Sequence, residues 1–422
     1  MSYKKISNFM LINSQNMMEE KRPFFNIQGS ISMLPQEERL AVGYERKSMV
    51  IGIPKEKILQ ERRVALVPSA VNHLVLEGNR VLIERGAGLA ANFSDIQYSE
   101  VGAEIVDSSA AVFKADIIAK IVPPTLEEVE FMKDRSTLIS ALHIQGQRQE
   151  VFRKLISKKI TALSYEHIRD KSNTHPVLHS ISEIVGSTAV LIGAKYLSDS
   201  KWGRGKMLGG FTGINPSNVV ILGAGTVGEF AARAAMGFGA TVKIFDNSLS
   251  KLSNIQHNLQ ARVFTSIIQE EILLDALISA DVVIGTIFPK YGANNLVITE
   301  AMVEKMKKGS VIVDVSIDKG GCSETSHETN HDDPVYQIHH VTHYCVPNIS
   351  SGTPHTSSYA LSNYIGPFIS ELSNAGGLEK ILMNDQGVRN GIYIYRGMVV
   401  MKEVSEYFGL PFHNLDLLLV SF

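Results

Sequence analysis

The sequence has little of what marks secreted, membrane-embedded or nucleic-acid-binding proteins. Its only two cysteines, Cys322 and Cys345, do not form a C-x-x-C pair, so we expect neither a disulfide framework nor a cysteine zinc site. No apolar run of about 20 residues occurs, so we expect no membrane-spanning helix. The 41 basic and 43 acidic side chains nearly balance, without a block of either sign, which argues against nucleic-acid and membrane partners. The sequence favours a cytoplasmic protein that acts on small molecules.

The first 48 residues differ in composition from the rest of the 422-residue chain. Their apolar residues are interrupted by the charged run at 19–22, and no small-residue cleavage pattern follows, so the segment is unlike a secretory signal. We expect residues 1–48 to form an appended arm without a packed core, and a translation start at Met33 or Met49 stays open. The remaining length predicts two or three domains.

A glycine-rich turn follows an apolar strand in the middle of the chain. Residues 218–222 lead into Gly223-Ala224-Gly225-Thr226-Val227-Gly228 and then into a helix-forming segment. In this G-x-G-x-x-G spacing the first glycine permits the tight turn, the second lets backbone N–H groups approach a pyrophosphate, and the third lets the helix pack closely. A second strand, 241–245, ends in Asp246, where a ribose hydroxyl acceptor belongs. Its charge would repel the 2′-phosphate of NADP, so the sequence favours NAD.

From Met49 onward, short apolar strands alternate with helix-length segments. This pattern predicts an α/β fold of two doubly wound (Rossmann-type) domains with a cleft between them. We assign residues 49–176 and 355–422 to a substrate domain and residues 177–354 to an NAD-binding domain. An apolar helix over 179–198 is the expected hinge, and helices over 357–375 and up to Phe408 return to the first domain. The expected strands lie at 50–53, 80–84, 115–121, 137–142, 160–165, 218–222, 241–245, 281–285 and 310–315.

Seven short motifs occur in an order that resembles the alanine dehydrogenase family. That family shares its fold with the NAD-binding subunit of proton-translocating nicotinamide nucleotide transhydrogenase. The resemblance covers about residues 49–415 and implies NAD-dependent, reversible oxidative deamination of L-alanine to pyruvate and ammonium by a homohexamer. The motifs are Gly52-Ile53-Pro54-Lys55-Glu56, Glu61 to Leu66, Ser182-Glu183, Gly203-Arg204-Gly205, the glycine turn, Ile317 to Cys322 and Tyr344 to Asn348.

The resemblance also implies roles for three charged or titratable residues. Arg63 matches the arginine that holds the substrate carboxylate, a role that suits a bidentate guanidinium, whereas a surface ion pair with Glu61 is the structural alternative. His143 follows a strand and matches the catalytic histidine, since an imidazole titrates near neutrality. Asp318 matches the aspartate that orients substrate and water, although an aspartate before two glycines also suits a turn.

The resemblance implies further cofactor contacts and does not imply a metal. Ser182, Asp246, Lys251 and Asn348 match positions that contact NAD, in addition to the turn residues Gly223, Gly225, Thr226, Val227 and Gly228. Lys251 also fits an ordinary solvated helix position. The five histidines between 327 and 343 have no spacing typical of metal ligands, so we interpret that stretch as a loop and expect no metal.

One position departs from the family pattern. The family's catalytic lysine is the second in Lys-x-Lys-x-Pro, and here Lys120-Ile121-Val122-Pro123-Pro124 places valine there. Lys120 faces the same side of a strand from about 6.6 Å back, so its long stem offers a replacement. The transhydrogenase subunit also lacks this lysine, so a changed or lost amino-acid site is the alternative. Three alternatives remain open. Lys120 takes part in catalysis and substrate binding, or the substrate is another small amino acid, or the protein is a relative that binds NAD(H) without turnover.

Overall fold

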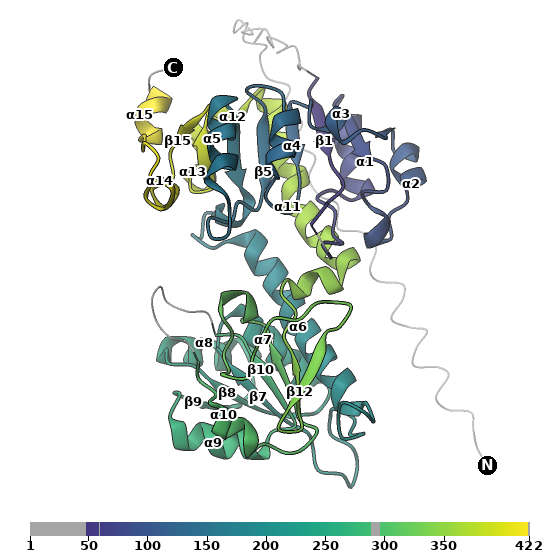
Figure 1. Ribbon diagram of the computed structural model, residues 1–422, viewed down its shortest axis with the longest axis vertical. Coiled ribbons are helices and arrows are strands. Elements are labelled where there is room, and N and C mark those ends of the chain that lie inside the picture. The colour runs from purple at the N-terminus through teal and green to yellow at the C-terminus, as the bar shows by residue number, and fades with distance from the viewer. Residues whose placement is uncertain (1–47, 59, 288–295, 421–422) are drawn as a thin grey trace, which may run out of the picture. The chain divides into compact units, whose positions relative to one another are not determined.

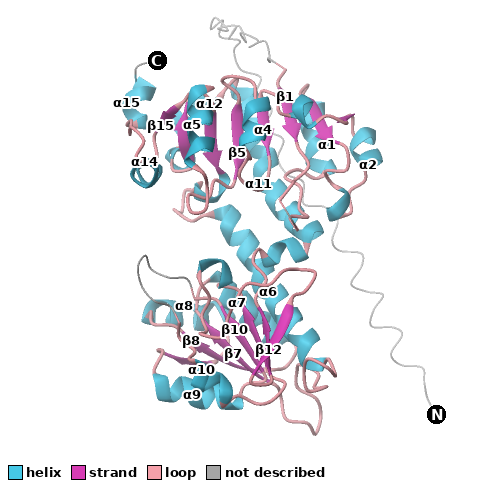
Figure 2. Cartoon of the chain, in the orientation of Figure 1, coloured by secondary structure: helices cyan, strands magenta, loops and turns pink. Residues whose placement is uncertain are grey.

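The computed structural model describes residues 48–58, 60–287 and 296–420, which contain two β-sheets flanked by helices (Figure 1, Figure 2). Residues 1–47 of the expected arm lie outside the described residues. The first sheet contains β1 (Val50–Ile53), β2 (Arg80–Glu84), β3 (Glu104–Val106), β4 (Ile117–Ala119), β5 (Thr137–Ser140), β6 (Thr161–Ser164), β14 (Ile392–Tyr395) and β15 (Met398–Val399). The second contains β7 (Asn218–Leu222), β8 (Thr241–Phe245), β9 (Phe264–Ser266), β10 (Val282–Gly285), β11 (Val311–Asp314), β12 (Val335–Ile338) and β13 (Val341–Tyr344).

Helices connect most successive strands. Those of the first half are α1 (Pro68–Leu76), α2 (Asp95–Glu100), α3 (Ser109–Val112), α4 (Leu126–Phe131), α5 (Gln149–Ser157) and α6 (Pro176–Ser198). The later ones are α7 (Thr226–Gly237), α8 (Leu249–Leu259), α9 (Glu270–Ser279), α10 (Glu300–Glu304), α11 (Pro354–Ala375), α12 (Leu378–Asn384), α13 (Gln386–Arg389), α14 (Lys402–Phe408) and α15 (Leu415–Val420). Single 3-10 turns occur at η1 (Leu89–Ala91), η2 (Tyr165–His167), η3 (Ile317–Lys319) and η4 (Ile349–Gly352).

Both sheets are doubly wound, which confirms the predicted fold class. The first has the order β15-β14-β6-β5-β4-β1-β2-β3 and the second β12-β13-β11-β10-β7-β8-β9. Six strands of each sheet run parallel, and antiparallel strands extend one edge. The chain reverses its direction of progress between β1 and β4, and again between β7 and β10. In open α/β sheets, ligands bind at the carboxyl ends of strands at such a switch point.

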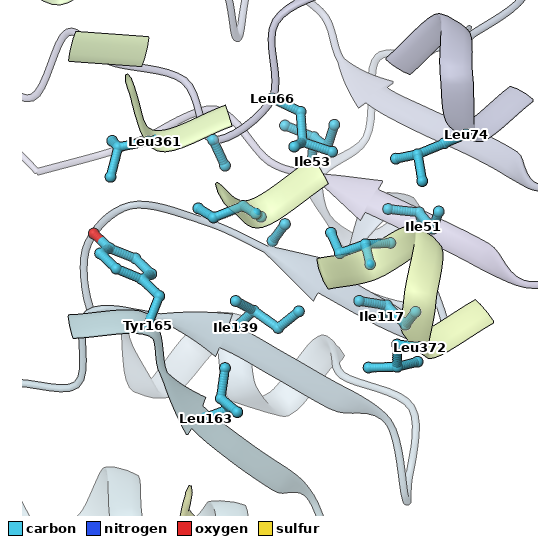
Figure 3. Close-up of a cluster of buried hydrophobic side chains, with 14 of the residues drawn as sticks. Ile51, Ile53, Leu66, Leu74, Ile117, Ile139, Leu163, Tyr165, Leu361 and Leu372 are labelled. Atoms are coloured by element: carbon cyan, nitrogen blue, oxygen red, sulfur yellow. The ribbon is translucent and has the colours of Figure 1, made fainter. Parts of the chain in front are cut away.

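Apolar residues give the central strands of the first sheet two buried faces. Ile51, Ile117, Ile139 and Leu163 pack on one face with residues of α1 and α11, as Figure 3 shows. Their neighbours Ile118, Leu138 and Ala162 pack on the opposite face with α5 and β14. Because α11 buries Leu361, Ile365, Ile369 and Leu372 in the first core, the C-terminal helices return to the first sheet as predicted.

Helix α6 begins at Pro176, three residues before the predicted start. It is packed along α7 at Gly186, where a Cβ would lie 2.3 Å from the Val227 carbonyl oxygen, and against β10 at Gly193. By length and composition alone, α6 is long and apolar enough to cross a membrane. Its apolar residues Val185, Ala189 and Val190 are buried in the second core, which accounts for that composition.

The structure corrects two further expectations. The histidine-rich stretch is not a loop throughout, since it contains the antiparallel pair β12 and β13. His339 and His340 form the two-residue turn between them, both with positive φ, which suits a hairpin turn. Strands β14 and β15 were not predicted, although Ile392-Tyr393-Ile394-Tyr395 has the aromatic and β-branched composition of a strand. The boundaries of the substrate and NAD-binding domains stay a prediction.

Candidate active site

Charged side chains gather where the strand order of the first sheet reverses. Strands β1 and β4 are neighbours, and the segments that follow them carry Glu56, Glu61 and Arg63 on one side and Lys120 and Val122 on the other. A hydrogen bond between backbone and side chain ties the two segments together, because the Ile121 N–H donates to Glu56 Oε1 over 2.5 Å. Residues far apart in the sequence therefore meet at this switch point.

Arg63 lies in a buried ion pair with Glu61. Its Nε and Nη2 donate to the two Glu61 oxygens over 2.8 and 2.7 Å, and Nη1 donates to Ser350 Oγ over 3.1 Å. Asn348, which has a left-handed φ of 53°, donates from Nδ2 to Glu61 Oε2 over 2.7 Å. Burial alone would raise the pKa of Glu61, but the hydrogen bonds and charge of Arg63 hold it below its ordinary value. The alternative of an ion pair between Arg63 and Glu61 is therefore present in the structure, but the pair is buried and not on the surface.

The Arg63 guanidinium keeps donor capacity for an anion. Glu61 takes the edge formed by Nε and Nη2, and Ser350 takes one N–H of Nη1. Of the five N–H groups of a guanidinium, the contacts with these residues leave one on Nη1 and one on Nη2. Those two groups can hold a carboxylate in a bidentate fork.

Lys120 is buried and paired away from any open surface. Its side chain is 2% exposed, and Nζ lies 2.8 Å from Glu128 Oε2 and 3.6 Å from Glu56 Oε2. Glu128 also completes the capping box of α4 with Thr125. Because an isolated charge is costly to bury, this pairing fixes Lys120 in place. The geometry argues against the expectation that Lys120 substitutes for a lysine at position 122, where Val122 packs against the first core.

His143 pairs with a carboxylate that the sequence did not single out. Its Nε2 lies 3.4 Å from Glu166 Oε2, and the imidazole is 56% exposed. The hydrogen bond that His143 donates to Glu166 raises the pKa of His143, despite partial desolvation. Burial alone would raise the pKa of Glu166, but the hydrogen bond and charge of His143 lower it. The pair therefore places an oriented imidazole after β5.

Asp318 belongs to the electrostatic environment of His143. It lies on η3 after β11, beside Lys319. Desolvation by the surrounding protein raises the pKa of Asp318, while the charges of Lys319 and His143 act to lower it. Asp318 in turn raises the pKa of His143, and Lys319 lowers it. The structure thus brings within electrostatic range His143 and Asp318, which follow strands of different sheets and are far apart in the sequence.

The glycine turn has the geometry that its spacing predicts. Gly223 has φ of 112°, and a Cβ there would lie 2.8 Å from the Thr286 carbonyl oxygen. A Cβ at Gly228 would lie 1.9 Å from the Gly223 carbonyl oxygen, so only glycine lets α7 approach β7 this closely. A Cβ at Gly225 meets nothing within 4 Å, which leaves room for a ligand above the first turn of α7. Thr226 and Val227 begin that helix without a side-chain cap, so its N–H groups suit a pyrophosphate.

Asp246 lies at the end of β8, as predicted, and touches the glycine turn. Its Oδ2 accepts from the Ala224 N–H and its Oδ1 from the Ser248 N–H, both over 2.8 Å. Each carboxylate oxygen retains a lone pair for a ribose hydroxyl. Lys251 lies in the first turn of α8, and Ser182 lies on α6 with partial exposure. The residues present therefore fit a dinucleotide without a 2′-phosphate.

The histidines between 327 and 343 do not gather around one point. His343 is buried, hydrogen-bonded to Thr325 and the Val341 carbonyl, and burial lowers its pKa to about 4. His327 stacks on Tyr336, and His339 pairs with Glu300. Within residues 48–58, 60–287 and 296–420, no group of three or more His, Cys, Asp and Glu side chains is placed to hold a metal ion.

Two family models together match most of the chain. The N-terminal domain of the alanine dehydrogenase/PNT family matches residues 52–185, and the C-terminal domain matches residues 189–402. The chain belongs to the alanine dehydrogenase/PNT family. An alanine dehydrogenase of Staphylococcus saprophyticus is 36% identical over 370 residues, which are 87% of this chain and 99% of that protein. That of Bacillus subtilis is 36% identical over 86% of this chain and 96% of its own length.

Solved structures of the same family share the fold. An L-alanine dehydrogenase superimposes with a TM-score of 0.80 at 36% identity, over 86% of this chain and 99% of that chain. A transhydrogenase from Sinorhizobium meliloti superimposes with a TM-score of 0.71 at 22% identity, over 84% of this chain and 99% of that chain. At that lower identity, the likeness shows a common fold.

Sequence reasoning did not single out Glu56, Tyr165 and Glu166 as part of this region. Each had a local signal, since Glu56 closes the first family motif and the Tyr165-Glu166 pair directly follows β6. Tyr165 donates to the Ile121 carbonyl over 2.8 Å, so the Ile121 peptide is held from both sides. What the sequence lacked was a reason to connect these residues to Lys120 and His143.

Proposed function

We propose that this chain is an NAD-dependent amino-acid dehydrogenase that converts L-alanine to pyruvate and ammonium, reversibly. Family membership supports the reaction class. The observation that supports the proposal is that Arg63 and His143 both act electrostatically on Glu166, while Asp318 acts on His143. These groups can hold a carboxylate, transfer a proton and orient a water molecule.

NAD is the cofactor that the glycine turn and Asp246 fit. The backbone at Gly225 and the start of α7 hold the pyrophosphate, and the Asp246 carboxylate accepts from the ribose hydroxyls. Ser182, Lys251 and Asn348 complete the proposed contacts. When bound, NAD supplies the acceptor for the hydride that leaves the alanine Cα.

The chain's own residues bind the substrate and move protons. Arg63 holds the substrate carboxylate with its free Nη1 and Nη2 hydrogens and so fixes the orientation of Cα. His143 Nδ1 accepts the proton from the water that adds to the oxidised carbon, while its Nε2–H donates to Glu166, which stabilises the resulting imidazolium. Asp318 orients that water and the leaving ammonia. In the reverse direction, His143 returns the proton.

The test of this proposal is NADH formation measured by absorbance after L-alanine is added. We expect turnover with NAD, and a loss of about 100-fold or more in kcat for His143→Ala, which removes the proton acceptor. NADH formation is also measured with glycine, serine and 2-aminobutyrate in place of L-alanine. A higher kcat/KM with one of them would show that it is the better substrate. If His143→Ala turned over as fast as the unaltered protein at every pH, the proton-transfer role would be wrong.

Val122 favours a second candidate function. Valine offers no hydrogen bond to the substrate, so a protein that binds NAD(H) without deaminating amino acids is the competing proposal. In that case the unaltered protein is nearly inactive, and Val122→Lys raises its rate, because a new cation stabilises developing negative charge. An active protein whose rate Val122→Lys lowers or leaves unchanged supports the dehydrogenase.

The assembly and compartment are parts of the same proposal. We propose a homohexamer, supported by family resemblance and by the exposed leucines Leu178 and Leu191 on α6, which are 39% and 53% exposed. Light scattering coupled to size exclusion measures the assembly. A cytoplasmic location is consistent with Cys322 and Cys345, which are both free thiols in the structure.

A further inference from the structure

A buried group of five charged residues surrounds the β1/β4 switch point. Glu56 lies 3.6 Å from Lys120, and Lys120 lies 2.8 Å from Glu128. Glu61 and Arg63 form the neighbouring pair and act electrostatically on Glu56. Tyr165 adds a buried hydroxyl from η2, and burial holds its pKa well above the ordinary value, so it stays neutral. Among the described residues, these are the titratable and charged groups that act electrostatically with Glu56.

The formal charges of this group do not balance when every residue is ionised. Arg63 is neutralised by Glu61, and Lys120 is neutralised by Glu128, so Glu56 contributes one surplus negative charge. Its side chain is only 4% exposed. One of its oxygens, Oε2, has no hydrogen-bond partner among the described residues, while Oε1 accepts from the Ile121 N–H.

A substrate carboxylate adds a second surplus charge to this group. In the family pattern, a lysine at position 122 supplies a positive charge next to Ile121, and here Val122 supplies none. Burial already raises the pKa of Glu56 to about 7, against the opposing effects of Lys120 and the Ile121 N–H. Glu56 is therefore the group whose charge is easiest to remove at neutral pH, and its Oε2, which accepts no hydrogen bond among the described residues, can carry the proton.

We propose that Glu56 takes up a proton from solvent when the substrate carboxylate binds beside Arg63. The protonation removes one negative charge from the buried group, which has the same effect on its net charge as the positive charge of a lysine at position 122. This inference rests on the proposed function. The balance is one proton bound per carboxylate bound, with no bond made or broken in the substrate. Glu56 acts as a positioning residue that also holds the Ile121 peptide. Two residues further along, Pro123 and Pro124 line the same small pocket as His143.

The KM for pyruvate should rise with pH, because the protein binds pyruvate when Glu56 is protonated. Below about pH 7, Glu56 is already protonated and pyruvate binds without proton uptake. Above that pH, Glu56 must be protonated on binding, so the KM for pyruvate rises by up to about tenfold per pH unit. Glu56→Gln imitates the protonated carboxyl and keeps an acceptor for the Ile121 N–H, so it abolishes this part of the rise.

The experiment measures protons directly. Pyruvate is titrated calorimetrically into the protein saturated with NADH at pH 8, in two buffers of different ionisation enthalpy. We expect the unaltered protein to take up about one proton more per site than Glu56→Gln. His143 contributes equally in both proteins, and Glu104→Gln, at an exposed carboxylate paired with Arg80, serves as the matched control with unchanged uptake.

A second variant tests the same inference without touching Glu56. Val122→Lys supplies the missing cation, so it should reduce the proton uptake and flatten the KM profile. Equal proton uptake in the unaltered protein and in Glu56→Gln would overturn the inference while leaving the dehydrogenase intact. If Glu56→Gln does not fold, unchanged uptake in Val122→Lys overturns it instead. Absence of pyruvate binding and turnover in all three proteins means that the proposed function itself is wrong.

Discussion

The two sheets of this chain use the same topology to build sites of opposite kinds. At the β7/β10 switch point, the site consists of backbone, since Gly223, Gly225 and Gly228 act by lacking side chains. At the β1/β4 switch point, it consists of side chains, since Glu56, Glu61, Arg63, Lys120 and Glu128 fill the space with ion pairs. One site recognises its ligand by room and N–H groups, and the other by charge.

This difference explains how the two sites tolerate change. A glycine turn is encoded within six consecutive residues, so its function survives as long as the spacing does. The charged site draws on segments near residues 56, 120, 143, 165 and 348, and each charge depends on the others. Position 122 is an example. Valine there removes the positive charge of the family lysine, and in our proposal protonation of Glu56 compensates for that loss.

The largest expected effect is the loss of Arg63. Arg63→Ala removes the carboxylate fork and leaves Glu61 buried without its partner, so we expect a loss of at least about 1000-fold in kcat/KM and about 3–5 kcal/mol in the free energy of unfolding. Arg63→Lys keeps the charge without the fork, so it should raise KM more than it lowers kcat. Steady-state kinetics and denaturant unfolding measure both effects.

Arg62 provides the control for that prediction. It lies next to Arg63 but is 40% exposed on its side chain, with Asp332 at 3.9 Å. Arg62→Ala should change kcat/KM and stability little, since exposed pairs contribute about 0–1 kcal/mol. Equal losses for the two alanine variants would mean that the buried pair has no special part in substrate binding.

The second prediction separates the packing and binding roles of the glycines. Gly228→Ala places a Cβ within 1.9 Å of the Gly223 carbonyl oxygen, so it should lower the melting temperature and NAD affinity together. Gly225→Ala meets open space in the free protein, so it should keep the melting temperature and weaken NAD binding about 100-fold by blocking the pyrophosphate. Equal melting temperatures for the two variants would contradict this division.

The sequence predicted the glycine turn better than the charged site, for the same reason. The glycine turn, the position of Asp246 and most strands were predictable, because they depend on local spacing and periodicity. The partners of Lys120 and His143 were not, because Glu128 and Glu166 reach them through tertiary packing that no local pattern encodes. Strand periodicity placed Lys120 on the same side as Val122, but a buried ion pair determines where its ammonium lies.

The third prediction concerns the carboxylate behind His143. Glu166 raises the pKa of His143, so Glu166→Gln should lower it toward the ordinary imidazole value. Since alanine oxidation requires neutral His143, the acidic limb of the kcat/KM profile should move to lower pH, with about a tenfold loss in kcat at its maximum. A profile that keeps its acidic limb in Glu166→Gln would assign that limb to a group other than His143.

The smallest expected effect is at Asp246, because it alters cofactor choice rather than turnover. Its carboxylate accepts from the N–H groups of Ala224 and Ser248 as well as serving the ribose, so any replacement also loosens the turn. Asp246→Ser keeps a small acceptor and removes the charge, so NADP should gain about tenfold in affinity relative to NAD as repulsion of the 2′-phosphate is relieved. Fluorescence titration with NADH and NADPH measures the ratio, and the melting temperature without cofactor reports the loosening separately. A ratio unchanged by the substitution, or equal affinities in the unaltered protein, would mean that the backbone site sets cofactor choice without this charge.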